Sequence, residues 1–161
     1  YCEALWFELG GHPDGPCEFI VTAEGDERHF DRVRRLVSAA PEMPGWKVIA
    51  FKPAHGFGFR TEYAGACLDP ARLWFQPLRQ ASRPGAVVLR VAMHEGVGLS
   101  EEDFVNAMHV VVDAGLGELV ASQRVSWIEA CAMPEDPEAE GFHPLDTLDD
   151  LVGWLSRRHD C

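Results

Sequence analysis

The stretch AVVLRVAMH, residues 86–94, decides the fold class of this chain. It is rich in β-branched residues and lies between Gly85 and Gly96, a pattern typical of a buried strand. Ser100 and the acids at 101–103 then form the usual start of a helix. One apolar face of that helix would consist of Phe104, Val105, Met108, Val111 and Val112. Because RVSWIEAC at 124–131 reads as another strand, this region predicts a β-α-β unit.

A second β-α-β unit is predicted upstream. EFIVTA at 18–23 reads as a strand, residues 26–40 as an amphipathic helix, and KVIAFK at 47–52 as a strand. ALWFEL at 4–9 is a further short strand. The turn-rich residues 10–16 would join it to 18–23 as a hairpin with a long loop.

The remaining segments are less regular. Residues 53–85 predict an inserted excursion with one short strand at 60–64 and its own aromatic anchors. Residues 134–141 (PEDPEAEG) predict an exposed linker loop. Thr147 and Asp150 resemble a capping box, which would begin a terminal helix. Its packing residues would be Leu148, Leu151, Val152 and Leu155.

Two β-α-β units in one chain predict an α+β fold of the ferredoxin-like, split βαβ type, with one antiparallel sheet and two helices on one face. The N-terminal hairpin strand, the inserted loop region and the C-terminal helix are additions to this βαββαβ core. A doubly wound parallel sheet is the alternative, but residues 53–85 supply no clear helix for it. The length of 161 residues fits one domain over 1–161.

Composition restricts the class of partner. The formal net charge is -12, from 26 acidic and 14 basic residues. Such a field repels nucleic acid and anionic lipid, so we expect neither as a partner and expect a basic protein instead. No apolar run reaches the length that spans a bilayer. The scattered cysteines (Cys2, Cys17, Cys67, Cys131 and Cys161) form no metal or disulfide pattern, which favours the cytoplasm.

One polar stripe could carry chemistry. Glu102, Asn106, His109 and Asp113 follow one another at helical spacing, and His94 ends the preceding strand. These residue types suit a divalent metal or acid–base work, so His94, Glu102, His109 and Asp113 are weak metal candidates. A stripe opposite an apolar face is more often a solvated surface, and we therefore predict no metal and no cofactor.

Other motifs favour structural roles. The basic cluster of Arg28, Arg32, Arg34 and Arg35 could grip a phosphate, but intrahelical pairing such as Asp31 with Arg35 is more common. HGFGF at 55–59 lacks a complete phosphate-loop pattern, so Phe57 and Phe59 are expected to pack inward. Neither Cys17 nor Cys131 has an activating neighbour in sequence, so neither is predicted to be a nucleophile. The tryptophans at 46, 74, 127 and 154 are expected in the core.

The segments FIVTAEGD (19–26), APEMPGWKVIAFKP (40–53) and LDP (68–70) resemble a family of uncharacterised bacterial proteins known only as a domain of unknown function. The resemblance covers most of residues 5–130 and implies no activity. Members of that family usually have a helical stretch before the position of Tyr1, so a preceding segment is expected. The acidic composition and element order are also distantly similar to the ribonuclease E regulator B family, acidic proteins that bind an enzyme.

Two functions remain open. The first is a non-enzymatic, acidic protein-binding or regulatory domain, with a homo-oligomer possible. The second is a small enzyme or ligand- or metal-binding protein whose site lies near His94 and His109, between the inserted loop and the second helix, with His55 and nearby acids converging there.

Overall fold

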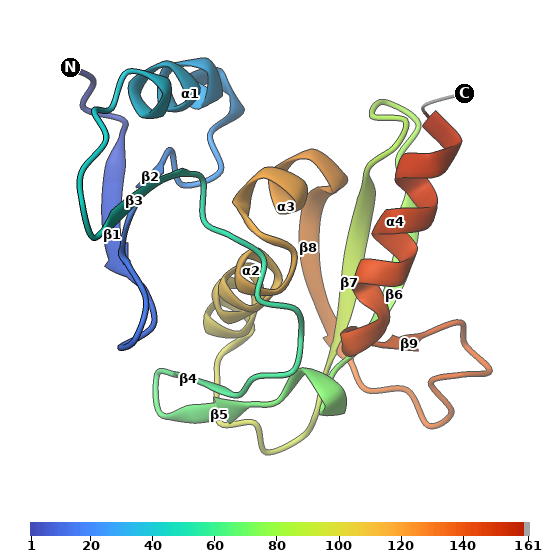
Figure 1. Ribbon diagram of the computed structural model, residues 1–161. Helices are drawn as coiled ribbons and strands as arrows, with labels where there is room; N and C mark the ends of the chain where they lie inside the picture. Colours follow the sequence, from blue (N-terminus) through green and yellow to red (C-terminus); the bar gives the residue numbers. More distant parts are fainter. Residues whose placement is uncertain (160–161) are drawn as a thin grey trace.

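The computed structural model describes residues 1–159 and has a mixed α+β architecture, which confirms the predicted class (Figure 1). The described strands form one three-stranded sheet, one four-stranded sheet and a small hairpin between them. The hairpin consists of β4 (Thr61–Tyr63) and β5 (Ala66–Leu68). Short 3-10 helices cover Glu27–His29, Pro70–Arg72 and Leu145–Thr147.

The three-stranded sheet belongs to the N-terminal unit. β1 (Trp6–Gly10) pairs antiparallel with β2 (Cys17–Thr22), as the sequence predicts for a hairpin, and β3 (Trp46–Ala50) pairs parallel with β2. Helix α1 (Phe30–Ser38) connects β2 to β3. Its buried Phe30 and Val33 pack with Val21 and Phe51 in a small core. Burial of these side chains holds the short helix on one face of the sheet.

The four-stranded sheet belongs to the C-terminal unit, and its strand order is β8-β7-β6-β9. β6 (Trp74–Arg79) pairs antiparallel with β7 (Val87–Met93), which pairs parallel with β8 (Val125–Ala132). Helices α2 (Glu101–Leu116) and α3 (Glu118–Arg124) connect β7 to β8. β9 (His143–Pro144) pairs with β6 on its other side.

The large core lies on one face of this second sheet. Leu89 of β7, Ile128 of β8 and Met108 of α2 are almost completely buried in it. The terminal helix α4 (Leu148–His159) adds Leu148 and Val152 to the same core, which confirms the expected packing of that helix. On the opposite face Arg90 bonds to Glu129 and Gln76.

The predicted single ferredoxin-like sheet differs from the structure in one respect. The two β-α-β units are present, but their strands lie in two separate sheets. In the split arrangement another strand would separate β2 from β3, whereas the structure pairs them directly. The reason lies in residues 53–85: they supply β6, an unpredicted strand, and β6 occupies the edge of β7 that the first unit would have needed.

Several local predictions are confirmed and others are wrong. Ser100 caps α2 by accepting a hydrogen bond from Asp103 N–H, as expected. Thr147 does not form the predicted cap, because its hydroxyl donates to the carbonyl of Pro144 instead. Trp127 is 61% exposed, and Trp46 and Trp154 are also exposed, so the prediction of core positions is wrong for these three. Within residues 1–159, no single helix has the length and apolar composition needed to cross a membrane; α2 and α3 reach them only as a pair bent by 118°.

Candidate functional site

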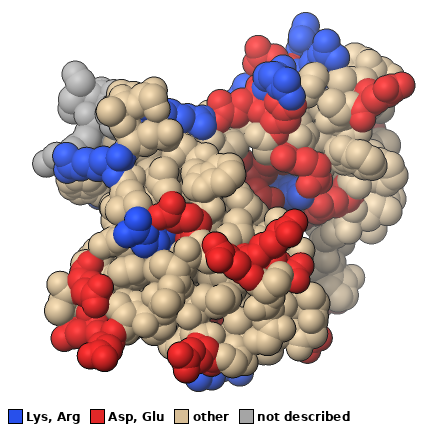
Figure 2. Space-filling model, turned by 180° about the vertical axis from the view of Figure 1, so that it is seen from behind, with Lys and Arg blue, Asp and Glu red and all other residues tan. Residues whose placement is uncertain are grey.

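A cleft of about 550 Å³ lies between the N-terminal sheet and helices α2 and α3. The N-terminal side contributes β1, β2 and the segments that follow β2 and β3, and the other side contributes α2, α3 and β8. Figure 2 shows a hollow in the surface with basic atoms at its bottom and acidic atoms around them. Apolar wall positions include Ile20, Val110 and Ile128. The cleft therefore combines an apolar lining with a charged centre.

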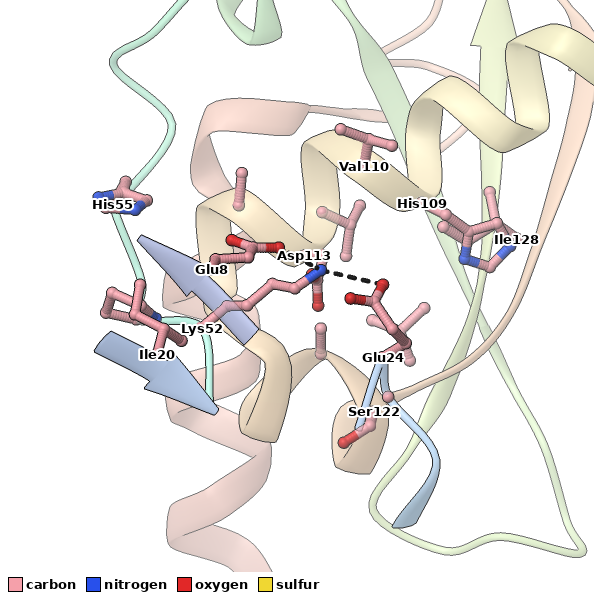
Figure 3. A pocket seen from close by; sticks show the side chains of 16 residues that line it. Glu8, Ile20, Glu24, Lys52, His55, His109, Val110, Asp113, Ser122 and Ile128 are labelled. Atoms are coloured by element: carbon pink, nitrogen blue, oxygen red, sulfur yellow. Dashed lines mark hydrogen bonds and ion pairs between the residues drawn. The ribbon is translucent and has the colours of Figure 1, made fainter. Parts of the chain in front are cut away.

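Lys52 is that centre. Its Nζ lies 3.1 Å from Glu24 Oε2, 3.3 Å from Glu8 Oε1 and 3.6 Å from Asp113 Oδ2 (Figure 3). The three carboxylates come from three different elements: the turn after β2, β1 and α2. Burial disfavours the ammonium, but the hydrogen bond and charge of Glu24 and the charges of Asp113 and Glu8 outweigh it, so the pKa of Lys52 is raised. Lys52 is therefore a cation at neutral pH and a poor nucleophile.

Asp113 lies in a less polar setting than the other two acids. Burial raises the pKa of its carboxyl, Lys52 lowers it, and the charges of Glu118 and Glu24 raise it further; the net direction is upward. The side chain is 29% exposed, and Lys52 Nζ lies 3.6 Å from its Oδ2. Asp113 thus carries an anionic charge that this environment disfavours unless a cation lies beside it.

Glu118, the first residue of α3, holds the backbone from which two of the cleft residues project. It is completely buried. Oε1 accepts from the backbone N–H groups of Ala23 and Gly25, each at 3.0 Å, and Oε2 accepts from Lys52 N–H at 3.1 Å. Glu24 and Lys52 therefore project into the cleft from backbone that a single carboxylate holds in place.

The backbone is strained at this point. Glu24 has a φ of 52° and Phe51 a φ of 68°, both in the left-handed region that side chains with a Cβ rarely adopt. These residues directly precede Gly25 and Lys52, which Glu118 binds. Strained residues of this kind cluster at binding sites, where the surrounding structure holds them.

The N-terminal and C-terminal units meet beside the Glu118 carboxylate. Gly117 caps α2 with a φ of 77°, and a Cβ there would lie 2.8 Å from Ala54 N and 3.1 Å from Lys52 O. His55 N–H donates to Ala114 O at 2.9 Å, and Gly56 N–H donates to Gly115 O at 3.1 Å. Glycine at 117 is required because the segment after β3 passes directly against the break between α2 and α3.

Two of the histidines proposed from sequence line the cleft. His109 and His55 both border it, on different sides in Figure 3. Burial lowers the pKa of His109, which favours its neutral form. Among the described side chains, neither imidazole ring has a hydrogen bond or ion pair. The two histidines therefore share the cleft without forming an acid–base pair.

The other sequence candidates lie elsewhere. His94 Nε2 is 3.0 Å from the carbonyl oxygen of Arg72, outside the cleft. Glu102 and Asn106 border a different depression beside Trp127. In the described part of the chain, no three or more ligating side chains are grouped so as to hold a metal ion. The stripe of α2 is thus divided, and only its second half, His109 and Asp113, faces the cleft.

The remaining motifs have structural roles. Arg28 forms a hydrogen-bonded pair with Asp26 and lowers the pKa of that carboxyl to about 2, and Arg34 pairs with Asp31 at 3.2 Å. The predicted intrahelical contact of Arg35 with Asp31 is made through the backbone carbonyl of Asp31. Phe57 is buried as predicted, against Gly115, where a Cβ would lie 2.2 Å from its ring.

Four residues in or beside the cleft were not predicted from sequence: Glu8, Glu24, Lys52 and Glu118. Two of them do lie at the ends of predicted strands of the first β-α-β unit, since Glu24 directly follows residues 18–23 and Lys52 ends residues 47–52. Nothing in the local sequence marked Glu118, because its three partners lie 66 to 95 residues away.

Comparisons with protein-family models, with curated proteins and with solved structures returned no match.

Proposed function

We propose that this chain is a non-enzymatic binding domain that receives a cationic side chain of a protein partner in the cleft around Lys52. The observation that carries the proposal is a cavity of about 550 Å³ in which three carboxylates surround one ammonium between apolar walls. An ammonium has three donors, and three carboxylates have twice as many acceptor oxygens, so the site keeps capacity for a further cation. The four cysteines in the described region are free, which fits action in a reducing compartment such as the cytoplasm.

The charge of the whole chain supports a basic partner. A formal net charge of -12 attracts a basic protein over a distance, and the cleft would then fix the position of one of its cations. The charge state of Lys52 argues against a nucleophilic or general-base role for it, and no acid among the described residues orients His109.

The test is affinity capture from a cell extract with two charge-matched variants, quantified by mass spectrometry. Glu24→Gln/Asp113→Asn removes two carboxylates from the cleft, and Glu62→Gln/Glu138→Gln removes two exposed carboxylates outside it. We expect a basic partner bound by the wild type and the control, weakened by salt, and lost by at least about tenfold from the cleft variant. Equal capture by both variants, or no partner at all, would refute the proposal.

A second function is favoured by the position of His55 and His109 in the same cleft. A small cationic molecule would find both the carboxylates and a neutral imidazole there. Isothermal titration with simple diamines and amino-acid amides distinguishes this from the first proposal, because a small ligand would bind without any protein partner. Turnover of such a compound, lost in His109→Gln, would make the chain an enzyme.

A further inference from the structure

The most exposed strand of the molecule borders the cleft. β1 is the terminal strand of the order β1-β2-β3, so in the described chain it is paired on one side only. All five of its residues are exposed, and Trp6, Phe7 and Leu9 are 61%, 63% and 63% exposed. An exposed edge of this kind is a template for another strand.

The two faces of β1 differ in character. Glu8 points into the cleft toward Lys52, and Trp6 lies on the same face by strand alternation. Phe7 and Leu9 lie on the other face, where Phe7 stacks on Phe19 with ring centroids 5.3 Å apart. Helix α1 packs on β2 and β3 and leaves Phe7 and Leu9 exposed. A strand added beside β1 would therefore meet an acidic side and an apolar side at alternate positions.

The protection of this edge strand is limited to its short length and one charged residue, Glu8. Native edges commonly carry lysine, proline or a bulge. The opposite edge of this sheet, β3, has Lys47, and the edge strand β8 of the second sheet is mostly half-buried against α2 and α3. β1 has none of the three, and its one charged residue is the acid Glu8.

We propose that the free edge of β1 pairs with an extended segment of the protein partner in which basic and apolar residues alternate. Its apolar side chains pack beside Phe7 and Leu9, and its basic side chains point past Glu8 into the cleft. This inference rests on the proposed function and specifies the partner segment. Charge selects a basic segment over a second copy of this chain, because two copies bring together two charges of -12 and two Glu8 side chains.

The experiment uses the full chain and two octapeptides of identical composition. One alternates arginine and valine, and the other has all its arginines before its valines. We expect the alternating peptide to bind about tenfold more tightly by titration calorimetry, because only it matches the two faces of β1. We also expect it to protect from hydrogen exchange those backbone amides of residues 6–10 that point away from β2.

Two lysine substitutions on exposed edge-strand residues provide the matched control. Leu9→Lys adds one charge to β1, and Trp127→Lys adds one charge at a site of similar exposure on β8. Only Leu9→Lys is expected to weaken the alternating peptide, by about tenfold, the contribution of one buried leucine.

Three results would overturn the inference: equal binding of both peptides, no protection of residues 6–10, or equal effects of the two lysine variants. If these occur while Glu24→Gln/Asp113→Asn still abolishes capture of the basic partner, the proposed function stands and only β1 pairing fails. A dimer in sedimentation that Leu9→Lys dissociates would assign the edge to a second copy, which also overturns it.

Discussion

The N-terminal and C-terminal units of this molecule have the same topology, but in the described chain only the C-terminal unit has its first strand paired on both sides. Each has two antiparallel strands, a helical connection and a third strand parallel to the second: β1-β2-α1-β3 in one, β6-β7-α2-α3-β8 in the other. In the C-terminal unit the first strand, β6, is covered by β9, and Phe75 on it is 1% exposed. In the N-terminal unit the first strand, β1, is exposed throughout.

The difference shows that topology alone does not determine how much of a unit is buried. The C-terminal unit contains most of the large core, while the N-terminal core has only Val21, Ala23, Phe30, Val33 and Phe51 as buried members. A unit with so small a core depends on its neighbour, here through Glu118, and can leave an edge available for binding. We therefore expect the C-terminal unit to determine global stability and the N-terminal unit to carry the binding surface.

The largest effect should come from the core of the C-terminal unit. Phe104 on α2 is completely buried, and Phe104→Ala should lower the free energy of unfolding by about 3–5 kcal/mol, because it removes apolar burial and leaves a cavity. Urea denaturation measures the change. Leu36→Ala, at an exposed position on α1, is the control. If Phe104→Ala lowered the free energy of unfolding no more than this control, the C-terminal unit would not determine global stability.

The next effect concerns the contact between the units. Glu118→Gln turns an acceptor oxygen into an amide that cannot accept from all three backbone N–H groups, and should cost about 1–3 kcal/mol. Hydrogen exchange of Ala23, Gly25 and Lys52 should rise while that of β7 stays slow. Glu129→Gln, at a partly exposed pair with Arg90, is the control. Uniform acceleration in both units would mean that they unfold together.

A loss of similar size is expected at the glycine between α2 and α3. Gly117→Ala combines a positive φ with a Cβ 2.8 Å from Ala54 N, and should destabilise by about 1–3 kcal/mol. Gly153→Ala in α4 is the matched control, because the nearest atom to its Cβ is the end of the flexible Arg157 side chain at 3.5 Å. The control should stabilise slightly through helix propensity. Thermal denaturation of the two variants gives the comparison.

These elements also show what the sequence could predict. β7, α2 and β8 were predictable because their apolar residues follow strand and helix periods. β6 was not, because Pro77 interrupts it and its partner β9 is only two residues long. Within the site, His55, His109 and Asp113 could be selected by residue type. The grouping of carboxylates around Lys52 could not be predicted. It depends on the packing of the two units against each other, and no local sequence pattern encodes that contact.

The pH dependence of stability should reveal the environment of Asp113. Burial raises its folded pKa above the unfolded value of 3.8, so its protonated form is favoured in the folded state. The stability that the protonated Asp113 carboxyl contributes is therefore fully present below pH 3.8 and is lost as pH rises through the higher folded pKa. Asp113→Asn should gain thermal stability relative to wild type across that rise. A constant difference between the two proteins at all pH values would contradict this.

The smallest effect is expected at β1 and bears directly on the comparison of the two units. Leu9→Lys should change the free energy of unfolding by no more than about 0.5 kcal/mol, because the side chain is already 63% exposed. Phe75→Lys, on the corresponding first strand of the C-terminal unit, would bury a charge and should prevent folding. If Leu9→Lys instead destabilised the isolated protein strongly, β1 would be covered in solution. The two units would then no longer differ, because a second copy would pair with β1 as β9 pairs with β6.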